Sequence, residues 1–254
     1  MARKISKFGW TPDLPDHRDH IYATAPHISV ALPPKVDLRP NCPPVLDQGE
    51  LGSCTANAIA NAHLFDQLKQ KVSKVFPPSR LFIYYNERAT EGTIKSDSGA
   101  MIRDGIKSIA QLGVCAETKW PYVIDKFTRK PTKPCYTAAL KNQALSYQRI
   151  NTLLEMQGCL ASGYPFVFGF SVYESFESEE VAKTGVVNMP TNSEKFIGGH
   201  AVLAVGYNFS TQRFIVMNSW GANWGDKGYF TIPYTYLSNN NLADDFWTVK
   251  KIKG

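Results

Sequence analysis

The sequence predicts an α+β fold with two lobes, because helical patterns occupy the first half of the chain and strand patterns the second. Apolar residues recur at three- and four-residue steps before residue 112, which is helical spacing. From about residue 145, runs of β-branched and aromatic residues replace them. Helices followed by strands favour separate layers over an alternating α/β sheet. With 254 residues, 43% of them hydrophobic, the chain can bury a sizeable core.

An extended arm is expected at the amino-terminal end, because closely spaced prolines interrupt any helix or central strand there. We place this arm at residues 1–34 and a single domain at 35–254. The helices should form one lobe at about 42–144 and the strands a second lobe at about 145–250. No internal repeat or low-complexity segment divides the chain further.

Three helices are predicted in the first lobe, at about 55–71, 79–90 and 101–112. Ser53 is a suitable N-cap for the first, since a serine side chain can accept a hydrogen bond from the first turn. Prolines end that helix before residue 79, and a glycine ends the third. One apolar face of the first helix contains Ala58, Ile59, Ala62, Phe65 and Leu68.

The strand region contains a predicted antiparallel hairpin. Its strands are His200–Tyr207 and Arg213–Asn218, joined by a turn at 208–212. This register places His200 opposite about residue 220, so that Asn218 lies within hydrogen-bonding reach of the imidazole. A polar strand end satisfied by backbone groups is the ordinary alternative for either residue. Two further strands are expected at Phe166–Phe170 and Gly228–Ile232.

Cys54 is the candidate nucleophile, because it follows a Gly-Ser turn at the start of the first helix. Unpaired backbone N–H groups and the helix dipole favour a thiolate there. A buried structural thiol is the alternative for any single cysteine. The five cysteines form no C-x-x-C pair, so we expect no metal site, and their odd number leaves at least one thiol without an intrachain partner.

Three segments together resemble the papain and cathepsin family of cysteine peptidases. Gln48–Cys54 resembles the nucleophile motif, Gly199–Val202 the histidine strand, and Asn218–Gly221 with the following Trp-Gly and Gly-Tyr pairs the asparagine motif. The resemblance spans roughly residues 35–250. It implies a papain-like fold with a helical lobe, a β-barrel-like lobe and an active-site cleft between them.

The resemblance also implies roles for individual residues. Cys54 would be the nucleophile, His200 its base and Asn218 the group that orients the base. The Gln48 side-chain amide and the backbone N–H of Cys54 would form the oxyanion hole. Trp220 would shield the hydrogen bond between His200 and Asn218 from water.

A substrate cleft follows from the same resemblance. One segment after the second helix would pair its backbone with an extended substrate. Two of its apolar side chains would form a pocket for the residue second upstream of the cut bond, beside a glycine that leaves room. We therefore expect a preference for a large apolar side chain there, unless a charged residue from elsewhere lines the floor of the pocket. The substrate-binding residues are Gly99, Ala100, Met101, Ile102, Gly199 and Trp224, the last on the leaving-group side.

The chain departs from the family pattern at two places near the nucleophile. Thr55 stands where the family usually has tryptophan, so the cleft floor must pack differently. Leu51 replaces a cysteine whose disulfide partner is also missing. Bridges between Cys115 and Cys135 or between Cys42 and Cys159 are left open, and so is the cellular compartment.

The resemblance implies a cysteine endopeptidase that acts on polypeptides through a thiolate–imidazolium pair of Cys54 and His200 and an acyl-enzyme, without a cofactor. A catalytically silent binding protein and a thiol acyl transferase or peptide ligase are the alternatives. The net charge of +6 is scattered, and neither a nucleic-acid motif nor a membrane-spanning run accompanies it. No signal peptide is recognisable, and we expect a monomer. A protein inhibitor or the arm itself is a further expected partner. The arm carries Phe8, Trp10 and Tyr22, with which we expect it to pack on the lobes or lie across the cleft.

Overall fold

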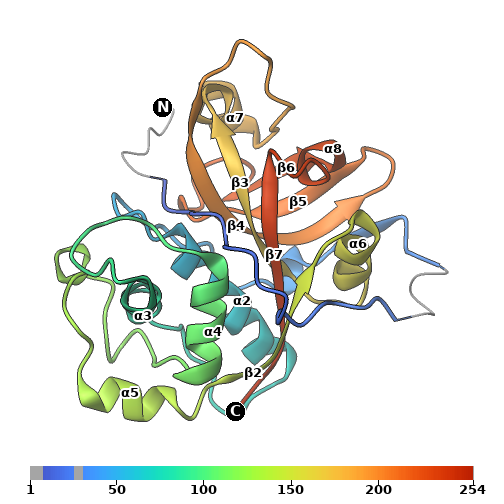
Figure 1. Ribbon diagram of the computed structural model, residues 1–254. Helices are drawn as coiled ribbons and strands as arrows, with labels where there is room; N and C mark the ends of the chain where they lie inside the picture. Colours follow the sequence, from blue (N-terminus) through green and yellow to red (C-terminus); the bar gives the residue numbers. More distant parts are fainter. Residues whose placement is uncertain (1–7, 26–30, 254) are drawn as a thin grey trace.

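The computed structural model describes residues 8–25 and 31–253 and confirms the α+β class. Helices from the first part of the chain lie on one side of the molecule and an antiparallel sheet on the other, with the first long helix between them (Figure 1). Among the described residues no helix is long and apolar enough to span a bilayer. The helices are α2 (Cys54–Lys69), α3 (Arg80–Glu91), α4 (Ile102–Gln111), α5 (Lys133–Ala139), α6 (Leu153–Ala161), α7 (Glu179–Thr184) and α8 (Tyr234–Leu237), with short 3-10 turns η1 (Arg39–Asn41), η2 (Ile124–Lys126) and η3 (Glu174–Glu177).

The sheet has the order β2-β7-β3-β4-β5-β6, with β1 paired to β4 at one side, and all its named pairs are antiparallel. This path is open, so the described strands form a curved sheet and not the closed barrel that a barrel-like lobe suggested. Helices α6, α7 and α8 also lie within this half of the chain. The strands are β1 (Lys35–Asp37), β2 (Ala144–Ile150), β3 (Phe166–Tyr173), β4 (Phe196–Asn208), β5 (Arg213–Met217), β6 (Tyr229–Pro233) and β7 (Ala243–Ile252).

The predicted hairpin is present as β4 and β5. Asn208 pairs with Arg213 and Leu203 with Met217, with one irregularity between Ala204 and Gly206. Because the register is close to the predicted one, the start of β4 faces the segment that follows β5. His200 and Asn218 therefore approach each other at this end of the sheet.

Helix α2 runs between the two halves of the molecule and is buried on all sides from Cys54 to Gln67. Its expected single apolar face is therefore wrong, and Leu68, assigned to that face, is 42% exposed. Small residues let other elements approach from every direction, which a one-faced pattern cannot describe. Ser53 occupies the N-cap position without capping the helix, because its hydroxyl hydrogen-bonds to Tyr122 Oη at 2.6 Å.

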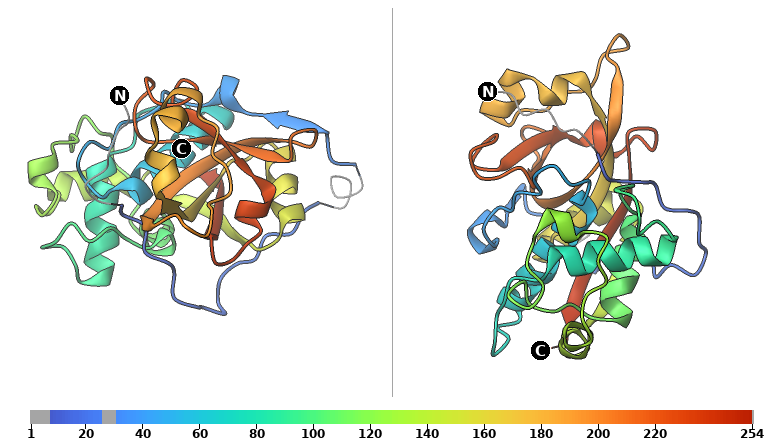
Figure 2. Two further views of the ribbon diagram at one scale, coloured as in Figure 1. Left: turned by 90° about the horizontal axis from the view of Figure 1, so that it is seen from above. Right: turned by 90° about the vertical axis from the view of Figure 1, so that its left-hand side faces the viewer.

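The described part of the arm runs along the surface across both halves (Figures 1 and 2, dark blue). Trp10 forms a parallel bridge with Ala100, and Ile21 forms another with Arg149 at the edge strand β2. Tyr22 is buried beside the sheet. The arm is thus a packed part of the molecule.

Candidate active site

Cys54 is the first residue of α2, and its side chain is completely buried. The preceding turn is tied to the other half of the molecule, since the Gln48 backbone N–H donates to Ser219 O at 2.9 Å. The Ala201 N–H donates to Cys54 Sγ at 3.4 Å. The sulfur at the helix start therefore touches the residue next to His200.

His200 and Asn218 form the hydrogen bond that their register predicted, with Nε2 2.8 Å from Asn218 Oδ1. The Ser219 backbone N–H donates to the same amide oxygen at 2.8 Å, which fixes the orientation of the asparagine side chain. Because Nε2 is engaged by this oxygen acceptor, it carries the proton in the neutral imidazole. Nδ1 is then the ring nitrogen that would exchange a proton with the thiol.

Gln48 is fully buried close to this pair. Its Oε1 accepts from the Ser219 hydroxyl at 2.7 Å, and its Nε2 donates to Leu51 O at 3.0 Å. An amide nitrogen carries two hydrogens, so one remains for an oxyanion. Sequence analysis missed the role of Ser219 in fixing the amide, because a serine in this position carries no signal of its own.

An aromatic cluster surrounds the histidine. The Trp220 ring lies 5.2 Å from the His200 ring at 33°, and Trp224 packs edge-on against Trp220 at 5.1 Å. Phe176 contacts both tryptophans, at 5.2 and 5.4 Å, although its sequence context had given no reason to select it. Trp220 is 3% exposed and Trp224 5%, so the cluster keeps water from the side of the imidazole that it covers.

The arm fills the cleft beside these residues. The Trp10 N–H donates to Gly199 O at 2.9 Å, while Gly9 O accepts from the Ala100 N–H at 2.8 Å. Phe8 lies 6.0 Å from the His200 ring. Of the residues expected to bind substrate, Ala100 and Gly199 thus bind the arm backbone, and a Cβ on Gly99 would strike it.

The other expected pocket residues lie around this contact. Ile102 is buried at the start of α4, and Met101 is half-buried directly before it, with its N–H donating to Glu91 at 2.7 Å. The structure therefore brings the cleft segment next to the arm.

Asp245, which the sequence analysis did not select, lies where the Trp10 side chain ends. Its Oδ2 accepts from Trp10 Nε1 at 3.0 Å and from the Asp13 N–H at 2.7 Å. Gly169 lies against the same side chain, because a Cβ there would overlap the indole of Trp10. A glycine inside a strand can mark a close approach, so Gly169 was the signal available in the sequence.

Buried ion pairs hold the next part of the arm. Arg103 of α4 pairs with Asp19 at 2.6 Å, and both side chains are largely buried. Asp13 accepts from the Arg103 N–H at 3.0 Å and from Trp247 Nε1 at 2.9 Å. These contacts link the arm to α4 and to β7 at once.

Burial opposes the thiolate that was expected at the start of α2. Burial raises the pKa of the Cys54 thiol to about 12, and the N–H groups of Ala201 and Gly9 offset only part of that rise. The helix start favours an anion, but removal of the sulfur from water dominates. With the arm in place, burial therefore favours the neutral thiol of Cys54 over the thiolate.

The departures near the nucleophile have structural counterparts. Thr55 donates its hydroxyl to Glu87 Oε2 at 2.9 Å, a buried polar contact in place of an indole. Burial raises the pKa of Glu87 well above its usual value. All five cysteines are free thiols, so neither of the bridges left open is formed in this structure.

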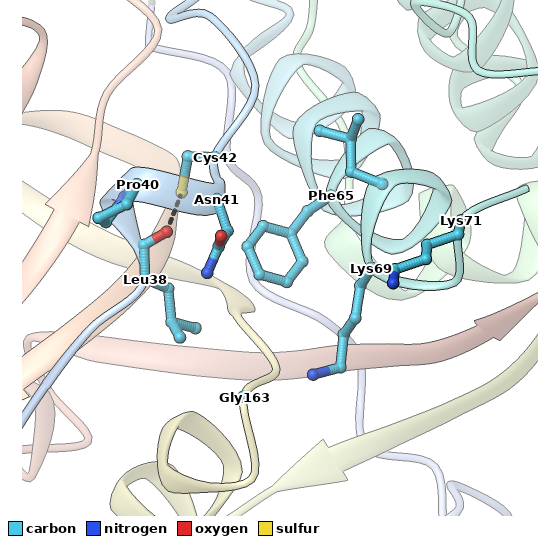
Figure 3. A pocket seen from close by; sticks show the side chains of 9 residues that line it. Leu38, Pro40, Asn41, Cys42, Phe65, Lys69, Lys71 and Gly163 are labelled. Atoms are coloured by element: carbon cyan, nitrogen blue, oxygen red, sulfur yellow. Dashed lines mark hydrogen bonds between the residues drawn. The ribbon is translucent and has the colours of Figure 1, made fainter.

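A hollow of about 530 Å³ lies away from this site, between η1 and the end of α2 (Figure 3). Leu38, Phe65 and Lys69 line it, and Cys42 Sγ beside them donates to Leu38 O at 3.4 Å. None of its lining residues is a catalytic candidate. The catalytic candidates instead lie against the arm.

Comparisons with known proteins agree with this geometry. Residues 32–246 match the family described as papain family cysteine protease. Xylellain, a cysteine protease from Xylella fastidiosa, is 46% identical, with a TM-score of 0.92 over 98% of this chain and 97% of that chain. A peptidase C1-like protein of Acanthamoeba polyphaga mimivirus is 45% identical over 96% of this chain and 87% of its own. Cathepsin K of Gallus gallus is 30% identical over 79% of this chain and 58% of its own.

Proposed function

Because the chain belongs to the papain family of cysteine proteases, we propose that it cuts polypeptides internally through Cys54 and His200. The observation that carries this proposal is the hydrogen bond of 2.8 Å between His200 and Asn218, next to a sulfur in contact with Ala201. Asn218 fixes the ring so that Nδ1 is the nitrogen that exchanges protons. This is the arrangement that a Cys-His pair requires.

In the proposed reaction, His200 takes the thiol proton and the sulfur of Cys54 attacks the peptide carbonyl carbon. The Gln48 amide and the Cys54 N–H stabilise the oxyanion. His200 then gives its proton to the leaving amine, and the C–N bond breaks to leave a thioester. Water, deprotonated by His200, attacks the thioester, and the thiol is restored when the acid product leaves.

We also propose that the arm is a built-in inhibitor of this reaction. The backbone N–H of Gly9 faces the sulfur, whereas its carbonyl accepts from Ala100. The nucleophile thus meets an N–H group where a substrate must present a carbonyl carbon. The arm therefore occupies the cleft without offering a bond that can be cut, and activity requires it to move away.

Labelling with an epoxysuccinyl probe tests the catalytic proposal. The full chain should lose one reactive thiol on labelling, with the modified peptide containing Cys54, and Cys54→Ala should remain unlabelled. Mass spectrometry of a peptide digest then separates hydrolysis from transfer of the acyl group to an amine. Internal cutting by Cys54→Ala at the wild-type rate would contradict the assignment.

A further inference from the structure

Tyr122 ties together the two ends of the turn that carries the proposed oxyanion donors. The turn begins at Gln48, whose side-chain amide is one donor, and ends at Ser53, directly before Cys54, whose backbone N–H is the other. The Tyr122 hydroxyl donates to Gln48 O at 2.8 Å and lies 2.6 Å from Ser53 Oγ. Tyr122 itself comes 74 residues after Gln48, in the loop before η2. One side chain from a distant loop thus spans the whole turn.

The hydrogen bonds around this hydroxyl run in one direction. A phenol has one hydrogen to donate, and the Gln48 carbonyl takes it, so Tyr122 must accept the hydrogen of the Ser53 hydroxyl. Ser53 Oγ in turn accepts from Asn57 Nδ2 at 3.0 Å. The donors therefore lead from Asn57 in the first turn of α2 through Ser53 and Tyr122 to Gln48. Because linked hydrogen bonds polarise one another, this chain holds the turn more firmly than separate bonds would.

Arg80 restrains the Tyr122 ring and the residue before the turn. Its guanidinium carbon lies 3.8 Å from the centre of the Tyr122 ring, and its Nη1 donates to Asp47 O at 2.9 Å. A salt bridge of 2.7 Å to Glu117 fixes the guanidinium in this place. The cation over the ring and the hydrogen bonds at its tip together leave Tyr122 little freedom, so its hydroxyl is a firm anchor for the turn.

The Gln48 amide depends on the shape of this turn. Its Nε2 donates to Leu51 O at 3.0 Å, and the same oxygen accepts from the Ser53 N–H at 2.8 Å. A shift at either end of the turn would move Leu51 O, and with it the amide hydrogen that remains for an oxyanion. The oxyanion exists only after the attack on the carbonyl, so a misplaced donor weakens the transition state and not the binding of the peptide.

We infer that Tyr122 is a positioning residue of the oxyanion hole, which acts on the reaction through Gln48. The inference rests on the proposed peptidase activity. Loss of the Tyr122 hydroxyl should lower kcat and kcat/KM by the same factor and leave KM unchanged, as for an interaction made only in the transition state.

Tyr122→Phe in the full chain tests this inference, in a parent enzyme that carries Asp19→Asn. This parent substitution removes the buried partner of Arg103 and so loosens the arm, and the ion pair involves no residue of the turn. Rates of cutting a fluorogenic peptide are expressed per Cys54 thiol titrated with dipyridyl disulfide, so that a loss of folded enzyme is not counted as a loss of rate. Tyr122→Phe should lower kcat by about tenfold with KM unchanged. Thiol–disulfide exchange forms no oxyanion, so the rate of exchange at Cys54 should stay the same.

A double-substitution cycle with Gln48→Ala separates positioning from a general structural role. Gln48→Ala should lower kcat by about a hundredfold. Adding Tyr122→Phe to it should lower kcat by less than about twofold more, because the group that Tyr122 positions is then absent. Tyr136→Phe is the matched control, since the Tyr136 hydroxyl donates to Asn86 Oδ1 at 2.9 Å and this bond involves no residue of the turn. Its kcat per titrated thiol should equal that of the parent.

Each outcome decides between the two proposals. An unchanged kcat in Tyr122→Phe, or a further loss of about tenfold when it is added to Gln48→Ala, overturns the inference and leaves the peptidase activity standing. If Tyr122→Phe yields no titratable thiol, Ser53→Ala takes its place, because it removes the hydroxyl that donates to Tyr122 and should also lower kcat; an unchanged kcat there overturns the inference. No cutting by the parent, although its Cys54 reacts with the disulfide, overturns the proposed function and this inference with it.

Discussion

Adding one methyl group to the arm should activate the enzyme. A Cβ built on Gly9 would lie 1.8 Å from Gly52 O, whereas real Cβ atoms essentially never come closer than 3.0 Å to such an atom. Gly52 is backbone in the turn before Cys54 and is held by Asp97 at 3.1 Å, so it cannot yield easily. Gly9 is not among the glycines with positive φ, so alanine would meet the clash and no backbone strain.

The size of the expected shift toward the open cleft follows from the hydrogen bonds that must break. A shift of more than 1 Å is needed to relieve the clash, and three backbone hydrogen bonds of 2.8–3.1 Å fix this stretch of the arm. At about 1 kcal/mol each, their loss weakens arm binding by about 3 kcal/mol. That is a shift of about a hundredfold in the equilibrium between covered and open cleft.

The rate of epoxysuccinyl labelling of the full chain measures this shift. Gly9→Ala should react at least tenfold faster than the wild type at pH 7. Thr11→Ala is the matched control, because the Thr11 side chain is exposed and its backbone N–H still donates to Ala100. Equal rates for Gly9→Ala, Thr11→Ala and the wild type would refute the view that the arm closes the cleft.

Three further predictions concern buried charge. Asp19→Asn removes one partner of a buried ion pair with Arg103, so it should release the arm and raise the labelling rate of Cys54 at least tenfold. An unchanged labelling rate would show that this ion pair does not hold the arm. The alkylation rate of Cys54 in the wild type should still rise above pH 9, since burial raises the pKa of this thiol to about 12. In Gly9→Ala the rate should level off at lower pH. Identical pH profiles for the two proteins would contradict burial as the cause of the raised pKa. Glu87→Gln should raise the melting temperature at pH 7 by about 2–4 °C, because burial raises the pKa of Glu87, which costs folding free energy above pH 4.5 that a neutral amide does not cost. This gain should shrink as the pH falls toward 4.5, and a lower melting temperature at pH 7 would contradict it.

Local patterns were sufficient to find the elements that carry the catalytic candidates. Helix α2 begins at Cys54, next to the predicted start, because a Gly-Ser turn precedes it. The hairpin that brings His200 to Asn218 follows from apolar runs on either side of a short polar turn. Both are consequences of interactions between residues near each other in the sequence.

The apolar pattern of α2 was misleading, because the burial of this helix depends on contacts with segments far away in the sequence. Helical periodicity predicts one buried face, yet Asn57 and Asn61 of this helix are also buried. Their side chains find partners in distant segments or in the preceding turn, such as Met217 for Asn61 and Ser53 for Asn57. Periodicity describes a helix with one packed side and cannot represent a helix packed between two lobes.

The fold class, the family and the catalytic candidates could be predicted from the amino-acid sequence, because motifs and strand register depend on short-range spacing. The burial of the nucleophile and the hydrogen-bond partners of Asp245 could be seen only in the folded chain. Burial raises the pKa of Cys54 in a site where Gly9, far away in the sequence, hydrogen-bonds to the sulfur, and Asp245 accepts a hydrogen bond from Trp10 at the other end of the chain. Burial and long-range hydrogen bonds depend on which segments meet, and that is settled only when the whole chain has folded.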